Sequence, residues 1–187
     1  MVLMVMLLRH ILLLGALVST LHAAWGQYEW IMNRGQWPET VAFKTQVQSG
    51  VFWTEKNGFT YQLFDPAALG AMHSAHGKLD GEILRSHVFR ATFVNGYAQY
   101  ISGDDKRPHY FNYYHNSDFS RHATHCEVYG RTRLHDVYAG IDVQVYAAGG
   151  GLKYDWVVAA GADPSAIVIE FDGVDCALVS RENGTDL

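Results

Sequence analysis

Apolar and polar residues alternate with a period of two along most of the chain after Gln27, and this pattern constrains the fold more than any other feature. The segments 41–47 (VAFKTQV) and 87–94 (HVFRATFV) show it most clearly. Successive side chains of a β-strand point to opposite faces, so the alternation predicts strands with one buried face. The 3.6-residue period of a long helix does not occur in the sequence. We therefore expect an all-β domain.

Turn residues divide this pattern into short strands. Asn57-Gly58, between segments 51–56 and 59–64, predicts a two-residue hairpin whose turn positions both need φ > 0. We read 66–84 as a surface excursion, 102–108 as a charged turn and 110–120 as irregular or edge-like. Further strands are expected over 97–101, 127–134, 141–147, 152–158, 166–171 and 176–180, the last four as a meander. The predicted architecture is an antiparallel β-sandwich built from meanders and hairpins, with an open β-barrel as the alternative.

The N-terminus has the three parts of a secretory signal. Residues 1–18 are apolar apart from Arg9 and His10, and small residues precede Gly26. A membrane anchor needs about 20 unbroken apolar residues, and the Arg9-His10 pair interrupts the run. We expect residues 1–26 to be a cleaved signal peptide and residues 27–187 to be a β-rich N-terminal domain, with no membrane span after signal removal.

Charge and the C-terminal end limit the partners. The net charge is −5, and loss of Arg9 with the signal makes it about −6. An acidic chain without a basic stripe is not expected to bind nucleic acid, because that binding needs cations to neutralise phosphates.

Residues 181–184 read as a turn whose return strand would begin near Leu187. We therefore expect the domain to be truncated here and to continue into downstream domains of the same polypeptide.

Two cysteines remain after cleavage, Cys126 and Cys176. Outside the cytoplasm they could form a disulfide that closes a loop of about 50 residues, adding roughly 4 kcal/mol by restricting the unfolded chain. Two buried, unpaired thiols are the alternative. The sequence leaves both readings open.

Histidines and nucleophiles do not form a known site. His115, His122 and His125 with Cys126, and the pair His73 and His76, match no compact zinc spacing. The sequence has no G-x-S-x-G elbow and no glycine-rich loop leading from a strand into a helix. We predict no metal site, no cofactor and no nucleophile.

Carboxylates are the remaining candidates for chemistry. Asp136, Asp142, Asp155 and Glu170 lie on or beside predicted strands, and a glycosidase needs two facing carboxylates. Asp155 and Glu170, however, fall on the polar side of their alternation, where they would meet water. We predict no catalytic residues and expect that the domain is not an enzyme.

Aromatic residues cluster in segment 110–114. Tyr110, Tyr113 and Tyr114, with Phe111 and the amide of Asn112, form a set typical of sugar-binding β-sandwich surfaces. The alternative is that these rings fill the core. We name the three tyrosines as candidate glycan contacts and leave both readings open.

Several motifs resemble a known family. They are NRGQW (33–37), EKNGFTY (55–61), NYY with NSD (112–114, 116–118), VYAGIDV (137–143), LKYDWVV (152–158) and GADP (161–164). In this order the chain is similar to the N-terminal domain of secreted Bacteroidota proteins with SBBP-type β-propeller repeats, which often carry type IX secretion or gliding-motility domains. Ala139 stands where that family usually has proline, and neither cysteine belongs to the shared pattern.

The resemblance implies a cell-surface or secreted location in a Gram-negative envelope and carries over no catalytic residue. Our leading hypothesis is a non-catalytic module serving assembly, adhesion or presentation, with a cell-surface glycan or protein as partner. The alternatives are a glycan-binding module that uses residues 110–114 and, third, an extracellular hydrolase.

Overall fold

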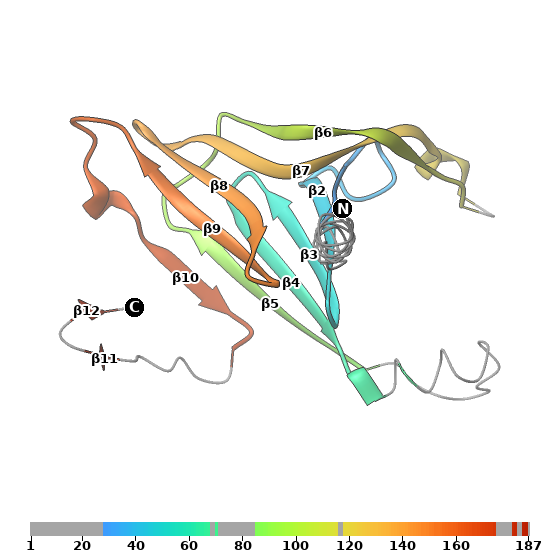
Figure 1. The fold of residues 1–187 in the computed structure, drawn as a ribbon, viewed down its shortest axis with the longest axis horizontal. Helices are drawn as coiled ribbons and strands as arrows, with labels where there is room; N and C mark the ends of the chain where they lie inside the picture. Colours follow the sequence, from blue (N-terminus) through green and yellow to red (C-terminus); the bar gives the residue numbers. More distant parts are fainter. Residues whose placement is uncertain are drawn as a thin grey trace, which may run out of the picture.

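The computed structural model describes residues 28–67, 70, 85–115 and 118–174, and the backbone of 181–182 and 185–186. Its strands are β1 (Trp30–Met32), β2 (Val41–Val47), β3 (Gly50–Glu55), β4 (Gly58–Phe64), β5 (Ser86–Phe93), β6 (Tyr100–Tyr113), β7 (Ala123–Tyr138), β8 (Ile141–Ala148), β9 (Gly151–Val158), β10 (Ile169–Asp172), β11 (Arg181–Glu182) and β12 (Thr185–Asp186). Single 3₁₀ turns span Phe119–Arg121 and Pro164–Ala166. Figure 1 shows the arrangement.

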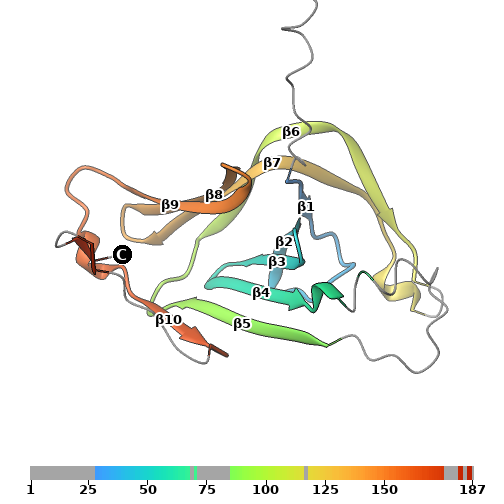
Figure 2. The same ribbon diagram turned by 60° about the horizontal axis from the view of Figure 1, so that its bottom comes forward.

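β1 to β10 form one antiparallel sheet, in the order β10-β5-β4-β3-β2-β1-β7-β8-β9 with β6 also paired to β7. The prediction of an antiparallel all-β domain is confirmed. The sheet curls into an open half-barrel (Figure 2), which is closer to the open-barrel alternative than to two separate sheets. Within the residues that the structure describes, β11 and β12 pair only with each other.

The long strand β7 holds the sheet together. β6 pairs along one edge of β7, while the other edge receives β1 opposite Val128 and Tyr129 and then β8 from Thr132 onward. The sheet therefore divides at β7 into a wing of β1 to β5 with β10 and a wing of β8 and β9. Strand twist brings the two wings face to face.

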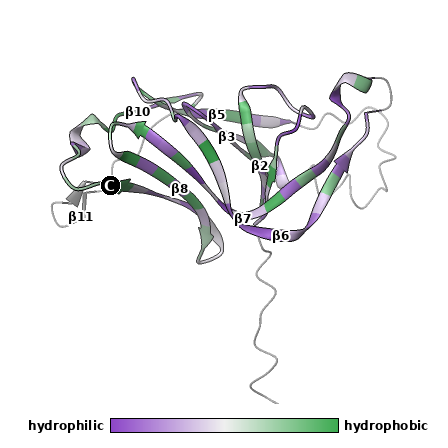
Figure 3. Cartoon of the chain, turned by 90° about the horizontal axis from the view of Figure 1, so that it is seen from above, coloured by the Kyte–Doolittle hydropathy of each residue, from purple (hydrophilic) through white to green (hydrophobic). Residues whose placement is uncertain are grey.

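The core lies between these wings. Phe59 of β4 is buried and contacts Phe52, Phe93 and Tyr154 of β9, at centroid distances of 5.1, 5.2 and 5.5 Å. Trp156, also on β9, lies 5.2 Å from Phe93. These rings stand at inward positions of the alternating pattern. Figure 3 shows this alternation as bands of hydrophobic and hydrophilic residues along the strands. Burying each large apolar side chain contributes roughly 1.5–3 kcal/mol.

The predicted hairpin at Asn57-Gly58 is present, but its turn lies one residue earlier. Glu55 pairs with Gly58, so Lys56 and Asn57 form the loop and Gly58 begins β4. Gly58 has φ 153°, and a Cβ there would collide with the carbonyl oxygen of Ala91. The glycine is thus needed for the close approach of β5 rather than for the turn.

Two other predictions were wrong. The predicted charged turn at 102–108 is the middle of β6, a 14-residue strand paired only with β7 in the described part of the chain. An edge strand tolerates charges and proline because one side makes no ladder. The expected four-strand meander also breaks after β9, because β10 pairs with β5 instead.

Some predictions fall outside the described residues. These are the signal peptide (1–26), most of the 66–84 excursion and the expected strand 176–180 with Cys176. Among the residues that are described, no helix combines the length and apolar character needed to cross a membrane.

Candidate functional site

The three candidate tyrosines lie at the far end of the two-stranded arm that β6 and β7 form. Tyr110 is 49% exposed, and its ring stacks on His125 at 4.3 Å between centroids. Tyr114 follows β6 and is 67% exposed. Both therefore present ring surface to solvent, as a sugar contact requires.

Tyr113 has a different environment. It pairs with the buried Ala123, and its half-buried ring packs edge-on against Trp37 at 5.3 Å. Burial raises the pKa of the Tyr113 hydroxyl. A register shift between Phe111 and Tyr113 separates it from the regular part of β6. The structure thus leaves two of the three tyrosines open and uses the third for packing.

Further aromatic surface surrounds Tyr114. His122 contacts the rings of both Tyr114 and Phe119, at 5.6 and 5.0 Å, and Phe119 is 76% exposed. Asp118 caps the 3₁₀ turn here by accepting a hydrogen bond from the Ser120 backbone N–H at 3.2 Å. Hydrogen bonds from Ser120 lower the pKa of the Asp118 carboxyl. An exposed aromatic group is therefore fixed on a capped turn.

A cation between two indoles lies beside this arm. The Lys44 ammonium is 5.4 Å from the ring centroids of both Trp37 and Trp53, and burial lowers its pKa. Trp37 in turn contacts Tyr113. Sequence reasoning missed this cluster, although Lys44 and Trp53 are register partners in β2 and β3.

The NRGQW segment is a loop that the side chains of Asn33 and Gln36 hold in shape. The Asn33 side-chain amide donates to the carbonyls of Pro38 and Val41, at 2.9 and 2.8 Å, and its oxygen accepts from Gly35 N–H at 3.0 Å. Gln36 is fully buried; it accepts from Arg34 N–H and donates to Met32 O. The shared residues here hold backbone in place, and their polar atoms are already bonded.

The histidines do not converge. His125 stacks on Tyr110, while a ring nitrogen of His122 lies 2.8 Å from the carbonyl oxygen of His115. Within the described residues, no group of three His, Cys, Asp or Glu side chains could hold a metal ion. His73 and His76 lie outside those residues.

Cys126 is buried beside Gln36 and has no disulfide partner among the described residues, and burial raises the pKa of its thiol. Its suggested partner, Cys176, is not among the described residues. Both readings from the sequence, a disulfide and two unpaired thiols, therefore stay predictions.

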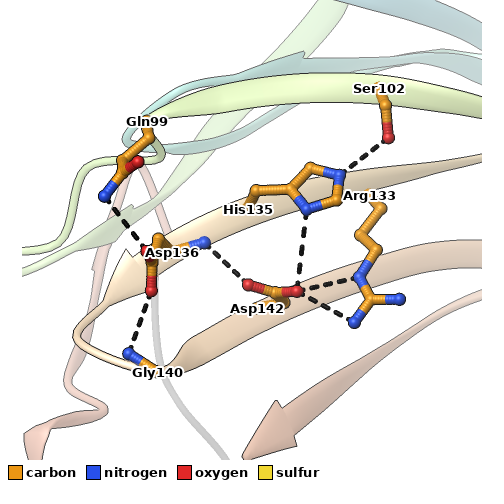
Figure 4. A network of polar contacts seen from close by, with 7 residues as sticks. All are labelled: Gln99, Ser102, Arg133, His135, Asp136, Gly140 and Asp142. Atoms are coloured by element: carbon orange, nitrogen blue, oxygen red, sulfur yellow. Dashed lines mark hydrogen bonds and ion pairs between the residues drawn. The ribbon is translucent and has the colours of Figure 1, made fainter.

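Asp142 is the best-connected of the four candidate carboxylates (Figure 4). Its Oδ2 accepts from Nε of Arg133 and forms an ion pair with Nη2 of the same side chain, each at 2.9 Å. Its Oδ1 accepts from the backbone N–H of Asp136 at 2.7 Å. Both oxygens are thus used to hold β8 to the end of β7.

Asp136 completes this turn. It has φ 53°, and its Oδ1 accepts from Gly140 N–H at 2.9 Å, while Oδ2 accepts from the Gln99 amide at 3.0 Å. Gly140 itself has φ 70°, a conformation that favours glycine. The GID segment of the VYAGIDV motif therefore fixes the β7–β8 connection.

A serine and a histidine also join the network. Ser102 Oγ lies 2.8 Å from Nε2 of His135, and the Nδ1 of His135 is 3.7 Å from Asp142 Oδ2 (Figure 4). The order Ser–His–Asp is that of a hydrolase triad. The second distance is too long for a hydrogen bond, and the oxygen concerned already serves Arg133.

The other two carboxylates face solvent. Asp155 accepts from the Tyr146 hydroxyl at 2.7 Å, and Glu170 is exposed on β10. Among the described residues, the one contact that joins two of these four residues is the hydrogen bond from the Asp136 backbone N–H to the Asp142 carboxylate. No facing carboxylate pair is formed by them.

Taken together, the curled antiparallel sheet, its long arm and its turn-fixing polar network define an all-β domain. A family described as "Domain of unknown function (DUF7948)" matches residues 30–185, and the chain belongs to this family. Neither the curated proteins nor the solved structures contain a match to the chain.

Proposed function

We propose that this domain is a non-catalytic module of a larger secreted or cell-surface protein, serving assembly, adhesion or presentation. One observation carries the proposal: two of the candidate carboxylates, Asp136 and Asp142, form hydrogen bonds that hold the β7–β8 turn. Asp142 bonds to Arg133 and to the Asp136 backbone, and Asp136 bonds to Gly140 and Gln99. A general base must present its carboxylate to substrate, whereas the oxygens of Asp136 and Asp142 accept hydrogen bonds from groups of the protein itself.

The extracellular location rests on the sequence. Residues 1–26 have the order of a signal peptide, with Arg9 before an apolar run and small residues before Gly26. The resemblance to N-terminal domains of secreted Bacteroidota repeat proteins agrees with it. Downstream domains of the same polypeptide are the first partners that we expect.

A reporter fusion tests the location. Residues 1–187 and residues 27–187 are each fused to alkaline phosphatase lacking its own signal and produced in a Gram-negative host. We expect phosphatase activity only from the longer fusion, with the mature protein beginning at Gln27. Equal, low activity from both fusions would refute export.

Glycan binding is the second candidate function, and the exposure of Tyr110 and Tyr114 favours it. Exposed aromatic rings can lie against the apolar face of a sugar, and the arm offers two of them. The amide oxygen of Asn112 is already used, since it accepts from the His125 N–H at 2.9 Å. Tyr113 is not proposed as a contact, because its ring packs on Trp37.

A glycan array probed with the mature chain tests this candidate. Tyr110→Ala and Tyr114→Ala are compared with Tyr97→Ala, a tyrosine that is 63% exposed but lies outside the arm. We expect glycan signals that both arm variants reduce at least about tenfold and the control leaves unchanged. Flat signals from the unmodified protein would end this candidate.

A further inference from the structure

Two strands of the sheet have a free edge at the opening of the half-barrel. In the described part of the chain, β9 pairs only with β8, and β10 pairs only with β5 (Figure 2). A free edge presents unpaired N–H and C=O groups, which another strand can satisfy. β6 also has a free edge, but Lys106, Arg107 and Pro108 protect it, together with two register shifts.

The directions of β9 and β10 allow one added strand to pair antiparallel with either edge. Eight steps separate β10 from β9 in the sheet order, and each step is antiparallel. β9 and β10 therefore run in the same direction. A strand antiparallel to β10 is also antiparallel to β9, so a single segment continues the ladder at either edge.

Apolar side chains on the inner face remain open at both edges. Phe171 pairs with the buried Ala91 and shares its face, yet it is 49% exposed. Val158 pairs with the buried Ile141 and is 40% exposed. These residues belong to the inner face but lack a neighbour on the open side. An added strand with inward apolar side chains would cover them.

The outer face of the same edges is acidic. Glu170 and Asp172 of β10 and Asp155 of β9 are exposed there, against two bases, Lys153 of β9 and Arg90 of β5, which is the register partner of Asp172. Among the described residues, neither Glu170 nor Asp172 takes part in an ion pair. The outward side chains of an added strand would therefore meet negative charge, which favours Lys or Arg at those positions.

We propose that the β10 edge accepts an extended strand from another polypeptide, with apolar residues alternating with Lys or Arg. The strand pairs antiparallel to β10, its apolar side chains cover Phe171 and its cations face Glu170 and Asp172. Strand addition of this kind takes affinity from backbone hydrogen bonds and specificity from alternate side chains. The proposal rests on the assembly role proposed above and names the partner that this role requires.

A synthetic peptide tests it. The mature chain is titrated into a fluorescein-labelled ten-residue peptide in which Val alternates with Lys, and anisotropy is measured. A peptide alternating Val with Glu is the charge control. Hydrogen exchange with and without the Val/Lys peptide then locates the contact. We expect saturable binding of the Val/Lys peptide alone and new protection of amides in β10.

Two aspartate variants test whether the peptide binds at the β10 edge. Phe171→Asp places a charge on the inner edge, and we expect it to weaken binding at least about tenfold. Phe119→Asp is the matched control, because Phe119 is also an exposed phenylalanine but lies in the 3₁₀ turn at the far end of the β6–β7 arm. It should change binding less than about twofold. Phe171→Ser, with circular dichroism of all variants, separates loss of binding from loss of folding.

Several results would overturn the proposal. These are absence of binding, equal binding of the Val/Glu peptide, and equal effects of Phe171→Asp and Phe119→Asp in folded protein. Protection, before peptide is added, of the β10 amides that point away from β5 would show an edge that is already paired. A concentration-dependent dimer with the same protection would make a second copy the occupant. The reporter fusion is independent of all these outcomes, so failure here leaves the export result unaffected.

Discussion

Asp142 and Arg133 are joined by two contacts of 2.9 Å, both to Oδ2, while Oδ1 of the same carboxylate holds the Asp136 backbone. This arrangement fixes β8 against the end of β7. We expect Asp142→Asn to lower the free energy of unfolding by about 1.5–3 kcal/mol, because the charge-assisted bonds to Arg133 are weakened. Urea denaturation measures the change. Asp155→Asn, which alters one exposed bond to Tyr146, is the control; an equal loss from it would contradict the structural role of Asp142.

Glu127 gives a pH-dependent contribution to stability. Hydrogen bonds from Lys106 and then from the Tyr129 hydroxyl lower the pKa of the Glu127 carboxyl. A carboxyl with a lowered folded-state pKa stabilises the fold above its unfolded pKa of about 4.3, and this stability is lost as the pH falls through the folded-state pKa. Glu127→Gln should therefore destabilise at pH 7 and match the unmodified protein in strong acid. A difference that persists unchanged at pH 2 would refute this linkage.

The buried hydroxyl of Thr45 lowers the free energy of unfolding, and a substitution can remove it. Its hydroxyl is fully buried and has no hydrogen-bond partner among the described residues. Thr45→Val keeps the shape and deletes the unsatisfied hydroxyl, so we expect a gain of about 1 kcal/mol in unfolding free energy. Thr60→Val is the matched control, because the Thr60 hydroxyl bonds to Glu55 and Arg90 and its loss should destabilise. If Thr45→Val destabilises as well, the hydroxyl has a partner in solution.

Phe59 joins the two wings through its contacts with Phe93 and Tyr154. We expect Phe59→Ala to lower the unfolding free energy by about 3–5 kcal/mol, since it leaves a cavity in the core. Thermal and urea unfolding would both report the loss. Phe119→Ala removes an exposed ring and should stay within about 0.5 kcal/mol. Similar losses from the two variants would mean that the wings do not share a core.

Strand positions could be predicted wherever the alternation reports local burial. The segment 41–47 matches β2 without an error, because its inward residues Val41, Phe43 and Thr45 are buried. β6 was missed because the charged residues 104–107 and Pro108 resemble a turn. That an edge strand with one partner can hold them depends on the pairing with β7, which is not local.

The candidate site was only partly predictable for the same reason. Tyr110, Tyr113 and Tyr114 are close in sequence, but a register shift in β6 and the distant Trp37 decide which ring is packed. The sequence marks Asp142 only as one of four carboxylates near strands. Its structural role depends on the hydrogen bond from Arg133 on the neighbouring strand. Both outcomes depend on contacts between strands that no local pattern encodes.

The central proposal is that the domain is non-catalytic, and Ser102 offers its most direct test. The Ser102 Oγ lies 2.8 Å from His135, and His135 in turn lies next to Asp142; among the described residues this is the only place where a serine, a histidine and an aspartate contact one another in that order. The mature chain is incubated with a fluorophosphonate probe, and labelling of Ser102 is measured by mass spectrometry beside hydrolysis of p-nitrophenyl acetate. We expect no more labelling or hydrolysis than Ser102→Ala gives. Stoichiometric labelling of Ser102, abolished by His135→Ala in folded protein, would contradict the claim.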